Sequence, residues 1–151
     1  MITDPPILKI RRSFPRPSPE LIVAFAGTQT GFLVDCMDGR GAFDHGIKPL
    51  DGDNAEFVAT AVTCHAGPND NLAVFAALDV IAPGDAIVAA ADGFTTTCIV
   101  GDLVLGMARN GGAVAFVTDG LVRDTDGIRD VGLPTFSRGV TPNSCVRNGR
   151  G

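Results

Sequence analysis

The sequence contains neither tryptophan nor tyrosine, and only 19% of its 151 residues are charged. Phenylalanine therefore supplies every aromatic ring, while alanine, valine and glycine supply much of the bulk. This composition suits closely packed α/β layers better than a binding surface rich in aromatic anchors. Hydrophobic residues make up 45% of the chain, which excludes a disordered protein and is enough for one domain with its own core.

Positive charge is also scarce, because the formal net charge is −5. The chain therefore has no electrostatic surface for nucleic acid, and the short basic cluster at Arg11, Arg12 and Arg16 is better explained as part of a solvated arm. No apolar stretch is long enough to span a bilayer, and the N-terminus lacks the basic and apolar regions of a signal peptide. We expect a soluble, reduced, cytoplasmic protein with no nucleic-acid partner and no membrane partner.

Common metal and nucleotide motifs are missing as well. The four cysteines, at positions 36, 64, 98 and 145, are too widely spaced for a CxxC pair. Cys64 and Cys98 lie in apolar runs and are predicted to be small buried hydrophobes. Neither GxGxxG after a strand nor GxxxxGK followed by Ser or Thr occurs, so nucleotide binding has no motif support.

Turn residues and hydrophobic periodicity divide the rest of the chain into elements. Residues 1–17 are rich in Pro and Arg and predict an extended arm, after which Ser18 and Pro19 mark the start of a short helix. Thr28 or Thr30 is expected to cap a second short helix. The remaining pattern predicts a loop at 38–54, strands at 57–64, 86–91 and 113–118, helices at 71–79 and 102–109, a further candidate strand at 134–137, and a tail from Arg138 with no obvious core contribution.

This alternation of strands and helices is typical of βαβ units joined into a mainly parallel sheet. The apolar run at 113–118 is continuous, as in a strand that is covered on both faces. We therefore predict that residues 18–151 form a single α/β domain.

Three polar residues lie at the ends of these predicted elements. Asp102 begins a helix, and Arg123 and Asp124 follow after an intervening stretch of twenty residues that includes a buried strand. A guanidinium binds a carboxylate through two parallel hydrogen bonds, and the free amides at a helix start favour an anion. These amides would be those of Leu103, Val104 and Leu105.

Such parts suit a 2-oxo acid, for example pyruvate or oxaloacetate. Arg123 would bind its carboxylate, and Asp124 would bind Mg²⁺, which takes one or two carboxylates and acts as a Lewis acid on the 2-oxo oxygen. Asp102 would orient a water for proton transfer, so the site would support retro-aldol cleavage or decarboxylation. Spacing alone, however, favours a simpler explanation, in which Asp102 is an ordinary helix cap and Arg123 and Asp124 form an exposed ion pair.

Several segments, in order, resemble a known family. They are GIKPL at 46–50, ATAVT at 59–63, NDNL at 69–72, PGDAIV at 83–88, GDL at 101–103, DGLVRD at 119–124 and PTFSRG at 134–139. From about Leu33 to its end, the chain resembles the family named after the regulator of ribonuclease activity A (RraA), which includes class II 4-hydroxy-4-methyl-2-oxoglutarate aldolases that also decarboxylate oxaloacetate. The family pattern of Asp, twenty residues, then Arg-Asp falls on Asp102, Arg123 and Asp124.

The resemblance implies a compact layered β/α/β fold, a divalent metal (Mg²⁺, Mn²⁺ or another) and a small 2-oxo acid substrate. It implies that Arg123 binds the substrate carboxylate and keto group, that Asp124 binds the metal and that Asp102 directs a water. It also implies a homotrimer, or a dimer of trimers, with active sites at subunit interfaces. Non-catalytic members that bind and inhibit a ribonuclease provide the alternative function, although retention of all three residues favours an enzyme.

The sequence departs from the family pattern in two places. Three residues after Asp124 the family often carries an acid, whereas this chain has Gly127, with Asp126 one residue earlier. An outer partner of the metal is therefore expected to be shifted or missing. The chain also stops at Gly151, before a further set of strands that in the family can lend an acidic residue to a neighbouring site.

Other polar residues are secondary candidates for the site. Asn71 or Asp70 is expected to cap the helix at 71–79, and Asn71 is better explained as a helix cap than as a substrate contact, although one residue can serve as both. Asp92 ends a strand on the edge of a parallel sheet where ligands bind. Asp126 is a third such candidate. His45 is expected at the surface or an interface, and His65, after the first strand, is not assigned as a base.

Overall fold

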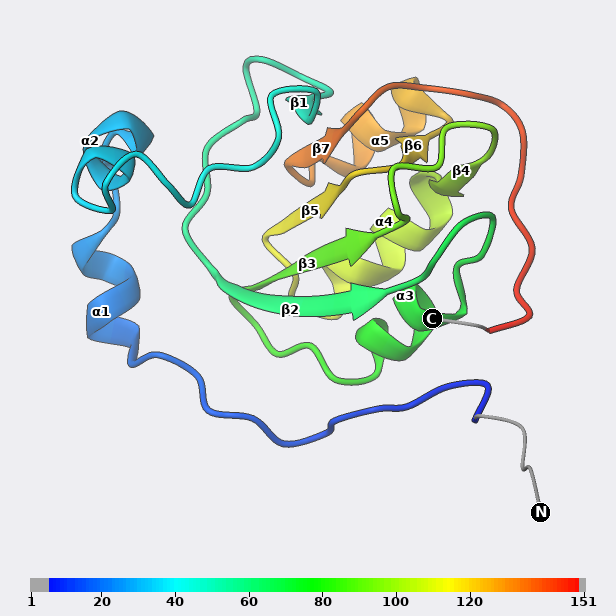
Figure 1. Cartoon of the computed structure of the whole chain (residues 1–151), viewed down its shortest axis with the longest axis horizontal. Coiled ribbons are helices and arrows are strands. Elements are labelled where there is room, and N and C mark those ends of the chain that lie inside the picture. The colour runs from blue at the N-terminus through cyan, green and yellow to red at the C-terminus, as the bar shows by residue number, and fades with distance from the viewer. Residues whose placement is uncertain (1–5, 150–151) are drawn as a thin grey trace.

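A computed structural model of the chain describes residues 6–149, and its main feature is a five-stranded sheet with the strand order β1-β7-β5-β3-β2 (Figure 1). Four of these strands run parallel, and they are β2 (Thr60–His65), β3 (Asp85–Ala90), β5 (Ala115–Thr118) and β7 (Thr135–Ser137). The two-residue β1 (Lys48–Pro49) pairs antiparallel with β7 at the edge. The predicted α/β fold with a mainly parallel sheet is therefore confirmed.

The strands of the sheet follow the apolar runs of the sequence closely. All four residues of β5 are buried, as predicted for a strand covered on both faces. The first predicted strand is shorter at its start, because residues 57–59 are irregular and pairing with β3 begins only at Thr60. The candidate strand at 134–137 is confirmed as β7.

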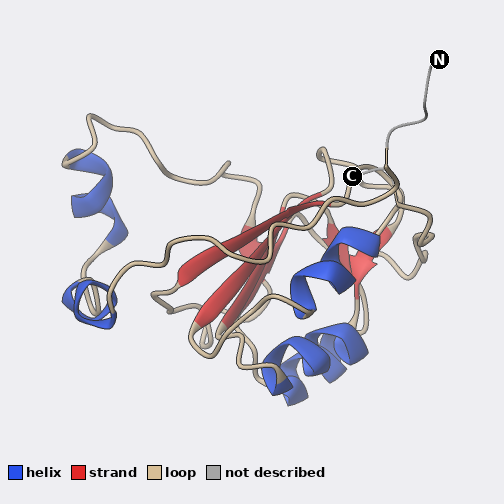
Figure 2. Ribbon diagram, turned by 90° about the horizontal axis from the view of Figure 1, so that it is seen from below, coloured by secondary structure: helices blue, strands red, loops and turns tan. Residues whose placement is uncertain are grey.

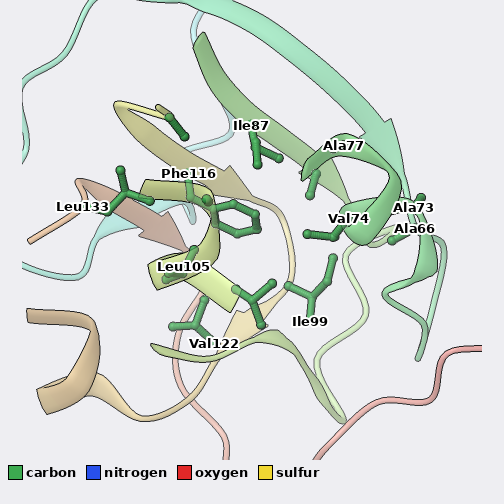
Figure 3. Close-up of a cluster of buried hydrophobic side chains, with 14 of the residues drawn as sticks. Ala66, Ala73, Val74, Ala77, Ile87, Ile99, Leu105, Phe116, Val122 and Leu133 are labelled. Atoms are coloured by element: carbon green, nitrogen blue, oxygen red, sulfur yellow. The ribbon is translucent and has the colours of Figure 1, made fainter. Parts of the chain in front are cut away.

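Three helices lie together on one side of the sheet (Figure 2). They are α3 (Leu72–Leu78), α4 (Asp102–Asn110) and α5 (Thr125–Val131). The hydrophobic core fills the space under these helices, where Phe116 and Ile87 from the sheet meet Leu105 and Val122 (Figure 3). All four of these residues are fully buried.

A second, two-stranded sheet lies between the core and the predicted site residues: its side chains are part of the core, and the site residues follow its two strands. It consists of β4 (Cys98–Val100) and β6 (Leu121–Val122), which run parallel. Neither of these strands is predicted from the sequence, and the same holds for helix α5. Strands of two or three residues are too short to show a period, so hydrophobic patterning could not find them.

The first two helices are short and lie apart from the rest of the fold (Figures 1 and 2). Helix α1 (Pro19–Ala24) begins with the predicted cap, because Ser18 Oγ accepts a hydrogen bond from the Leu21 amide at 3.3 Å. Helix α2 (Thr30–Asp35) has Gln29 at its N-cap and no side-chain cap bond, so the prediction of a threonine cap is wrong. Neither helix has a buried residue.

The segments at the two ends of the described chain are attached to the fold by specific contacts. Residues 6–17 contain no helix or strand, but Arg16 Nη2 lies 2.7 Å from Asp85 Oδ2 at the start of β3. At the other end, the tail pairs with three separate segments through the bridges Val122 to Val140, Cys98 to Ser144, and Asp70 to Val146. The tail therefore pairs with the fold, while no residue of 138–149 belongs to the hydrophobic core, as predicted. None of the helices formed by residues 6–149 is long and apolar enough to cross a membrane.

Candidate active site

The small sheet brings the predicted site residues together. Val100 of β4 lies opposite Val122 of β6, and the Arg123 amide donates to the Val100 carbonyl at 3.1 Å. Because the carboxyl ends of parallel strands meet at the same edge of a sheet, Asp102 after β4 lies beside Asp124 after β6. The twenty residues between Asp102 and Arg123 thus contain the rest of α4, then β5 and β6. Helix α4 and strand β5 form the connection between the neighbouring strands β4 and β6.

Asp102 is the first residue of α4, and Gly101 is the N-cap. Its Oδ1 accepts a hydrogen bond from the next amide, that of Leu103, at 2.7 Å. An N-cap side chain instead bonds an amide two or three residues further on. The explanation of Asp102 as an ordinary helix cap therefore does not apply to this geometry.

The start of α4 offers fewer free amides than predicted. The Leu105 amide donates to the Gly101 carbonyl at 3.2 Å, and the Leu103 amide is taken by Asp102. Of the three predicted donors, only the Val104 amide has no acceptor within residues 6–149. An anion bound here would therefore depend mainly on Arg123.

Arg123 and Asp124 form an ion pair at the mouth of the site. Arg123 Nε lies 3.0 Å from Asp124 Oδ2, and Arg123 Nη1 donates to the hydroxyl of Ser144. Their side chains are 39% and 46% exposed, and pairs with this exposure contribute little to stability. Both groups can therefore turn toward a ligand at small cost.

Two backbone features make room for this pair. Asp124 has φ 57° and ψ 50°, a left-handed conformation that costs a non-glycine residue about 1 kcal/mol. It occupies the N-cap of α5, yet its side chain makes no cap bond, which leaves the carboxylate available. Gly101 is the second feature, because a Cβ there would lie 2.5 Å from Asp124 Oδ2 and 3.0 Å from Arg123 Cγ.

Gly127, where the family often has an acid, is the residue on which Asp102 rests. A Cβ on Gly127 would lie 2.8 Å from Asp102 Cβ and 2.9 Å from Asp102 Cγ, closer than real side chains approach. Gly127 contributes no carboxylate to the site, but its lack of a side chain leaves room for the carboxylate of Asp102.

An open cavity of about 390 Å³ lies beside these residues. Helix α4 and the Arg123–Asp124 pair form one part of its wall, and the tail forms another through Ser144, Cys145 and Arg147. Sequence reasoning missed all three tail residues. They lie in a stretch of Pro, Asn, Ser and Gly without periodicity, and only their contacts with distant segments bring them to the site.

Asn71 also lines this cavity, but not as a helix cap. Its Nδ2 donates to the Ile99 carbonyl at 3.1 Å, while its Oδ1 accepts from Arg147 Nε at 3.4 Å. Asp70 supplies the cap instead, since its Oδ1 accepts from the Leu72 amide at 2.8 Å. Of the two predicted caps, the structure therefore confirms Asp70, and the Asn71 side chain makes no cap bond.

The other secondary candidates lie outside this cavity. Asp126 lines a neighbouring hollow of about 330 Å³ together with Arg123 and Asp124, but its own carboxylate is 95% exposed and paired with Arg129. Asp92 pairs with His65, whose Nε2 lies 2.8 Å from Asp92 Oδ1, at the end of the central sheet. The structure therefore does not bring Asp92 into the cavity.

The thiols near the cavity are held in the protonated form. Burial raises the pKa of Cys98 and outweighs the nearby guanidinium of Arg123, which lowers it. Burial likewise raises the pKa of Cys145. Neither thiol has the depressed pKa of a nucleophile, so the chemistry of the site rests on its carboxylates and guanidinium groups.

The donors present fit a divalent metal that is held loosely. Residues 6–149 contain no group of three or more His, Cys, Asp or Glu side chains arranged to enclose a metal. Mg²⁺, however, often binds through one or two carboxylates and keeps several waters. The half-exposed Asp124 carboxylate, next to the space left by Gly101, meets that requirement.

Comparison with known proteins gives relatives of two kinds. The sequence profile of the RraA-like family, described as Aldolase/RraA, matches residues 30–151. A protein of Halalkalibacterium halodurans with the provisional name 4-hydroxy-4-methyl-2-oxoglutarate aldolase is 38% identical over 132 residues. That match covers 87% of this chain but only 62% of the length of the relative.

Solved structures share the fold. The RNA-processing inhibitor RraA from Thermus thermophilis superposes with a TM-score of 0.72 at 24% identity, over 82% of this chain and 74% of that one. RraAS2 of Streptomyces coelicolor, described as an unusual member of the RNase ES inhibitor RraA family, gives a TM-score of 0.72 at 26% identity. That match covers 85% of this chain and 68% of the other.

Proposed function

We propose that this chain, which belongs to the RraA-like family of aldolases and RraA proteins, is a divalent-metal-dependent carbon–carbon lyase of 2-oxo acids. The observation that carries the proposal is the meeting of Asp102, Arg123 and Asp124 at one end of the small sheet, beside a cavity of about 390 Å³. The substrates are a 4-hydroxy-2-oxo acid, which releases pyruvate, and oxaloacetate.

Each residue has a part in the proposed reaction. Arg123 binds the carboxylate and keto oxygen of the 2-oxo acid through its guanidinium donors. Asp124 holds Mg²⁺ or Mn²⁺, which when bound supplies Lewis-acid stabilisation of the keto oxygen. Asp102, whose side chain lies against Gly127, holds a water that carries protons to and from the substrate.

In the proposed cleavage, the water held by Asp102 is the proton carrier that the bond changes require. The water on Asp102 takes the proton of the 4-hydroxyl, the bond between C3 and C4 breaks, and its electron pair passes to the keto acid as pyruvate enolate. A proton returned to C3 gives pyruvate, and the other fragment leaves as a carbonyl compound. In oxaloacetate the same bond breaks with loss of CO₂, so both reactions use the same groups.

The test is pyruvate release from 4-hydroxy-4-methyl-2-oxoglutarate and from oxaloacetate, followed by coupled oxidation of NADH with lactate dehydrogenase. We expect activity with Mg²⁺ or Mn²⁺ and its loss on chelation. Arg123→Ala should lower kcat/KM by about a hundredfold to a thousandfold, since it removes donors aimed at developing charge. Arg40→Ala, which removes an exposed loop guanidinium, is the matched control.

Absence of pyruvate from either substrate with metal-loaded protein would contradict the proposal. A non-catalytic regulator of a ribonuclease is then the better function, since the structural relatives are described as RNA-processing inhibitors. Recovery of a stoichiometric ribonuclease partner by metal-free protein would support that alternative.

We further propose that the protein works in the cytoplasm as a homotrimer. Support comes from the two N-terminal helices, which expose large apolar side chains to solvent. These include Leu21, Val23, Phe25, Phe32 and Met37, which are 40–71% exposed. A second copy of the chain would cover them.

A further inference from the structure

The two edges of the central sheet differ in how well they are protected against a further strand (Figure 1). The β1 edge is two residues long and consists of Lys48 and Pro49, and both residue types discourage strand addition. The β2 edge is six residues long, and its sequence, TAVTCH, contains no proline, lysine or carboxylate. The unprotected edge of the sheet is therefore β2.

The outer side of β2 presents free backbone groups. The Ala66 amide donates to the Ala90 carbonyl at 2.8 Å, next to the His65–Ala90 pair of the ladder. Because successive backbone groups point to opposite sides of a strand, those of Ala61, Thr63 and His65 point away from β3. No other backbone group of residues 6–149 bonds to them. An extended peptide along this edge would supply their hydrogen-bond partners.

A groove of about 500 Å³ borders this edge. Residues 61–65 of β2 form one wall, and residues 8–11 of the N-terminal arm form another. Small side chains of α3 also line it, among them Ala73, Ala76 and Ala77. The groove shares no lining residue with the cavity beside α4, so it is a separate surface of the molecule.

The arm is held away from β2 by its side chains. Arg12 pairs with Asp79 after α3, and Arg16 pairs with Asp85 at the start of β3. No backbone hydrogen bond joins residues 6–17 to β2. The arm therefore forms a wall of the groove without pairing with the strand.

The charge of the groove is opposite to that of the protein as a whole. Lys9 and Arg11 line it and no Asp or Glu does, although the net charge of the chain is −5. Both side chains are exposed, and within residues 6–149 neither forms an ion pair. His65, at the end of β2, is paired with Asp92. The groove is thus complementary in charge to carboxylates.

We propose that the β2 edge binds an acidic, extended peptide of a partner protein as an added strand of the central sheet. The main chain of the peptide pairs with the outward-pointing groups of Ala61, Thr63 and His65, which gives affinity without a sequence requirement. Its carboxylates contact Lys9 and Arg11, which gives the preference for an acidic partner. This interaction is independent of the proposed lyase activity.

The probe is a fluorescein-labelled peptide of seven residues, with blocked ends, in which glutamate and valine alternate. Anisotropy titration with the full chain should show saturable binding. The matching lysine–valine peptide should bind about tenfold more weakly or less, since two exposed contacts change from attraction to repulsion. Arginine and lysine side chains of the arm are thereby tested without any change to the protein.

Methylated peptides test the strand pairing separately from the charge. The amides of a strand point alternately to its two sides, so only one alternate set faces β2. N-methylation of that set should abolish binding of the glutamate–valine peptide. N-methylation of the other set should leave the affinity within about threefold, because no hydrogen bond to the protein is lost.

Variants assign the two contributions to the chain. Lys9→Glu combined with Arg11→Glu should weaken binding of the acidic peptide by about tenfold and strengthen that of the lysine peptide. Arg40→Glu combined with Lys48→Glu, the same change of charge outside the groove, should alter neither affinity. Thr63→Pro removes an outward-pointing amide and spares the ladder with β3, so it should weaken binding by about fivefold.

Four results would overturn the inference: no binding of the acidic peptide, equal binding of both peptides, equal effects of the two methylation patterns, or unchanged affinity in the Lys9/Arg11 double variant. A peptide that copies residues 7–12 is a further probe, and its tighter binding would assign the edge to the arm of a second copy instead. Thermal unfolding separates a folding defect of Thr63→Pro from lost pairing, which the methylated peptides test on the wild type.

Discussion

At the scale of single residues, the contact between Gly127 and Asp102 determines where the proposed proton carrier lies. Glycine inside a helix ordinarily costs about 0.5–1 kcal/mol relative to alanine. Here the glycine is needed, because a Cβ would meet the Cβ and Cγ of Asp102 at less than 3 Å. Glycine at position 127 therefore lowers the stability of α5 but leaves room for the carboxylate of Asp102.

Gly127→Ala should therefore lower kcat by about tenfold or more, because it displaces the water-directing carboxylate. In an Asp102→Ala background the steric conflict is gone, and the same substitution should stabilise the fold by about 0.5–1 kcal/mol. Urea unfolding of the four proteins in this cycle checks the sign. An equal effect of Gly127→Ala in both backgrounds would show that the two residues do not interact.

The four cysteines should differ sharply in their reactivity. Burial raises the pKa of Cys64 to about 12, and it also raises the pKa values of Cys98 and Cys145, whereas Cys36 is exposed. A disulfide reagent at pH 8 should therefore modify one thiol quickly and three slowly, because the thiolate is the reactive form. Cys36→Ser should abolish the fast phase, and a fast phase that survives would contradict this assignment.

At the scale of elements, Asp70 connects the start of α3 to the tail. Its carboxylate is 7% exposed and accepts three backbone N–H groups, from Leu72, Asn148 and Gly149. Burial alone would raise the pKa of Asp70, but these donors and nearby Arg147 together lower it below its ordinary value of 3.8. The ionised carboxylate is therefore the form that holds the tail.

Asp70→Ala should destabilise the protein by about 2–3 kcal/mol at pH 7, since three backbone donors, of which the Gly149 amide is buried, lose their acceptor. Asp53→Ala, in an exposed loop, is the matched control and should have little effect. Because the folded-state pKa lies below the unfolded one, the contribution is complete above the ordinary pKa and disappears as the pH falls through the folded value. The difference between wild type and Asp70→Ala, from urea unfolding, should thus narrow below about pH 4.

Predictability from sequence differed between elements for physical reasons. Helix α4 and strand β5 carry enough apolar residues to show their period, and both were predicted within two residues of their observed bounds. Helix α5 has cap residues at both ends, Asp124 and Gly132, but it contains Gly127 and buries only Ile128, so its sequence shows no apolar face. Its existence depends on packing against α4.

The candidate site was predictable in part. Asp102, Arg123 and Asp124 were found because they stand at element ends, and the structure places them together. The bonds that occupy the Leu103 and Leu105 amides could not be foreseen without the helix start being known to one residue. Arg147 gave no local signal, since its partners lie more than seventy positions away in the sequence.

At the scale of the whole molecule, helices α1 and α2 stand outside the fold (Figure 2). Neither helix has a buried residue. Val23 and Phe32 are 71% and 61% exposed, and side chains of this kind, grouped on neighbouring helices, are typical of an interface. The proposed homotrimer would bury them.

Light scattering coupled to gel filtration should therefore give about three times the chain mass of 15.6 kDa. Val23→Glu combined with Phe32→Glu should shift the protein toward monomer, since each would place a charge in an apolar contact. The control exchanges two exposed residues outside these helices, Arg129→Glu and Asp53→Lys; it also alters two positions, without a net change in charge, and should leave the mass unchanged. A monomeric wild type would contradict the trimer.

The attachment of the tail also fixes when the site is completed during synthesis. Gly149 bonds to Asp70, a residue 79 positions earlier, and Ser144 contacts Arg123. Once β7 has left the ribosome, the nascent chain already contains every strand of the central sheet and most of the core. It still lacks the cavity wall formed by Ser144 and Arg147. Completion of the cavity wall is therefore a step separate from the folding of the sheet, because it needs residues that follow β7.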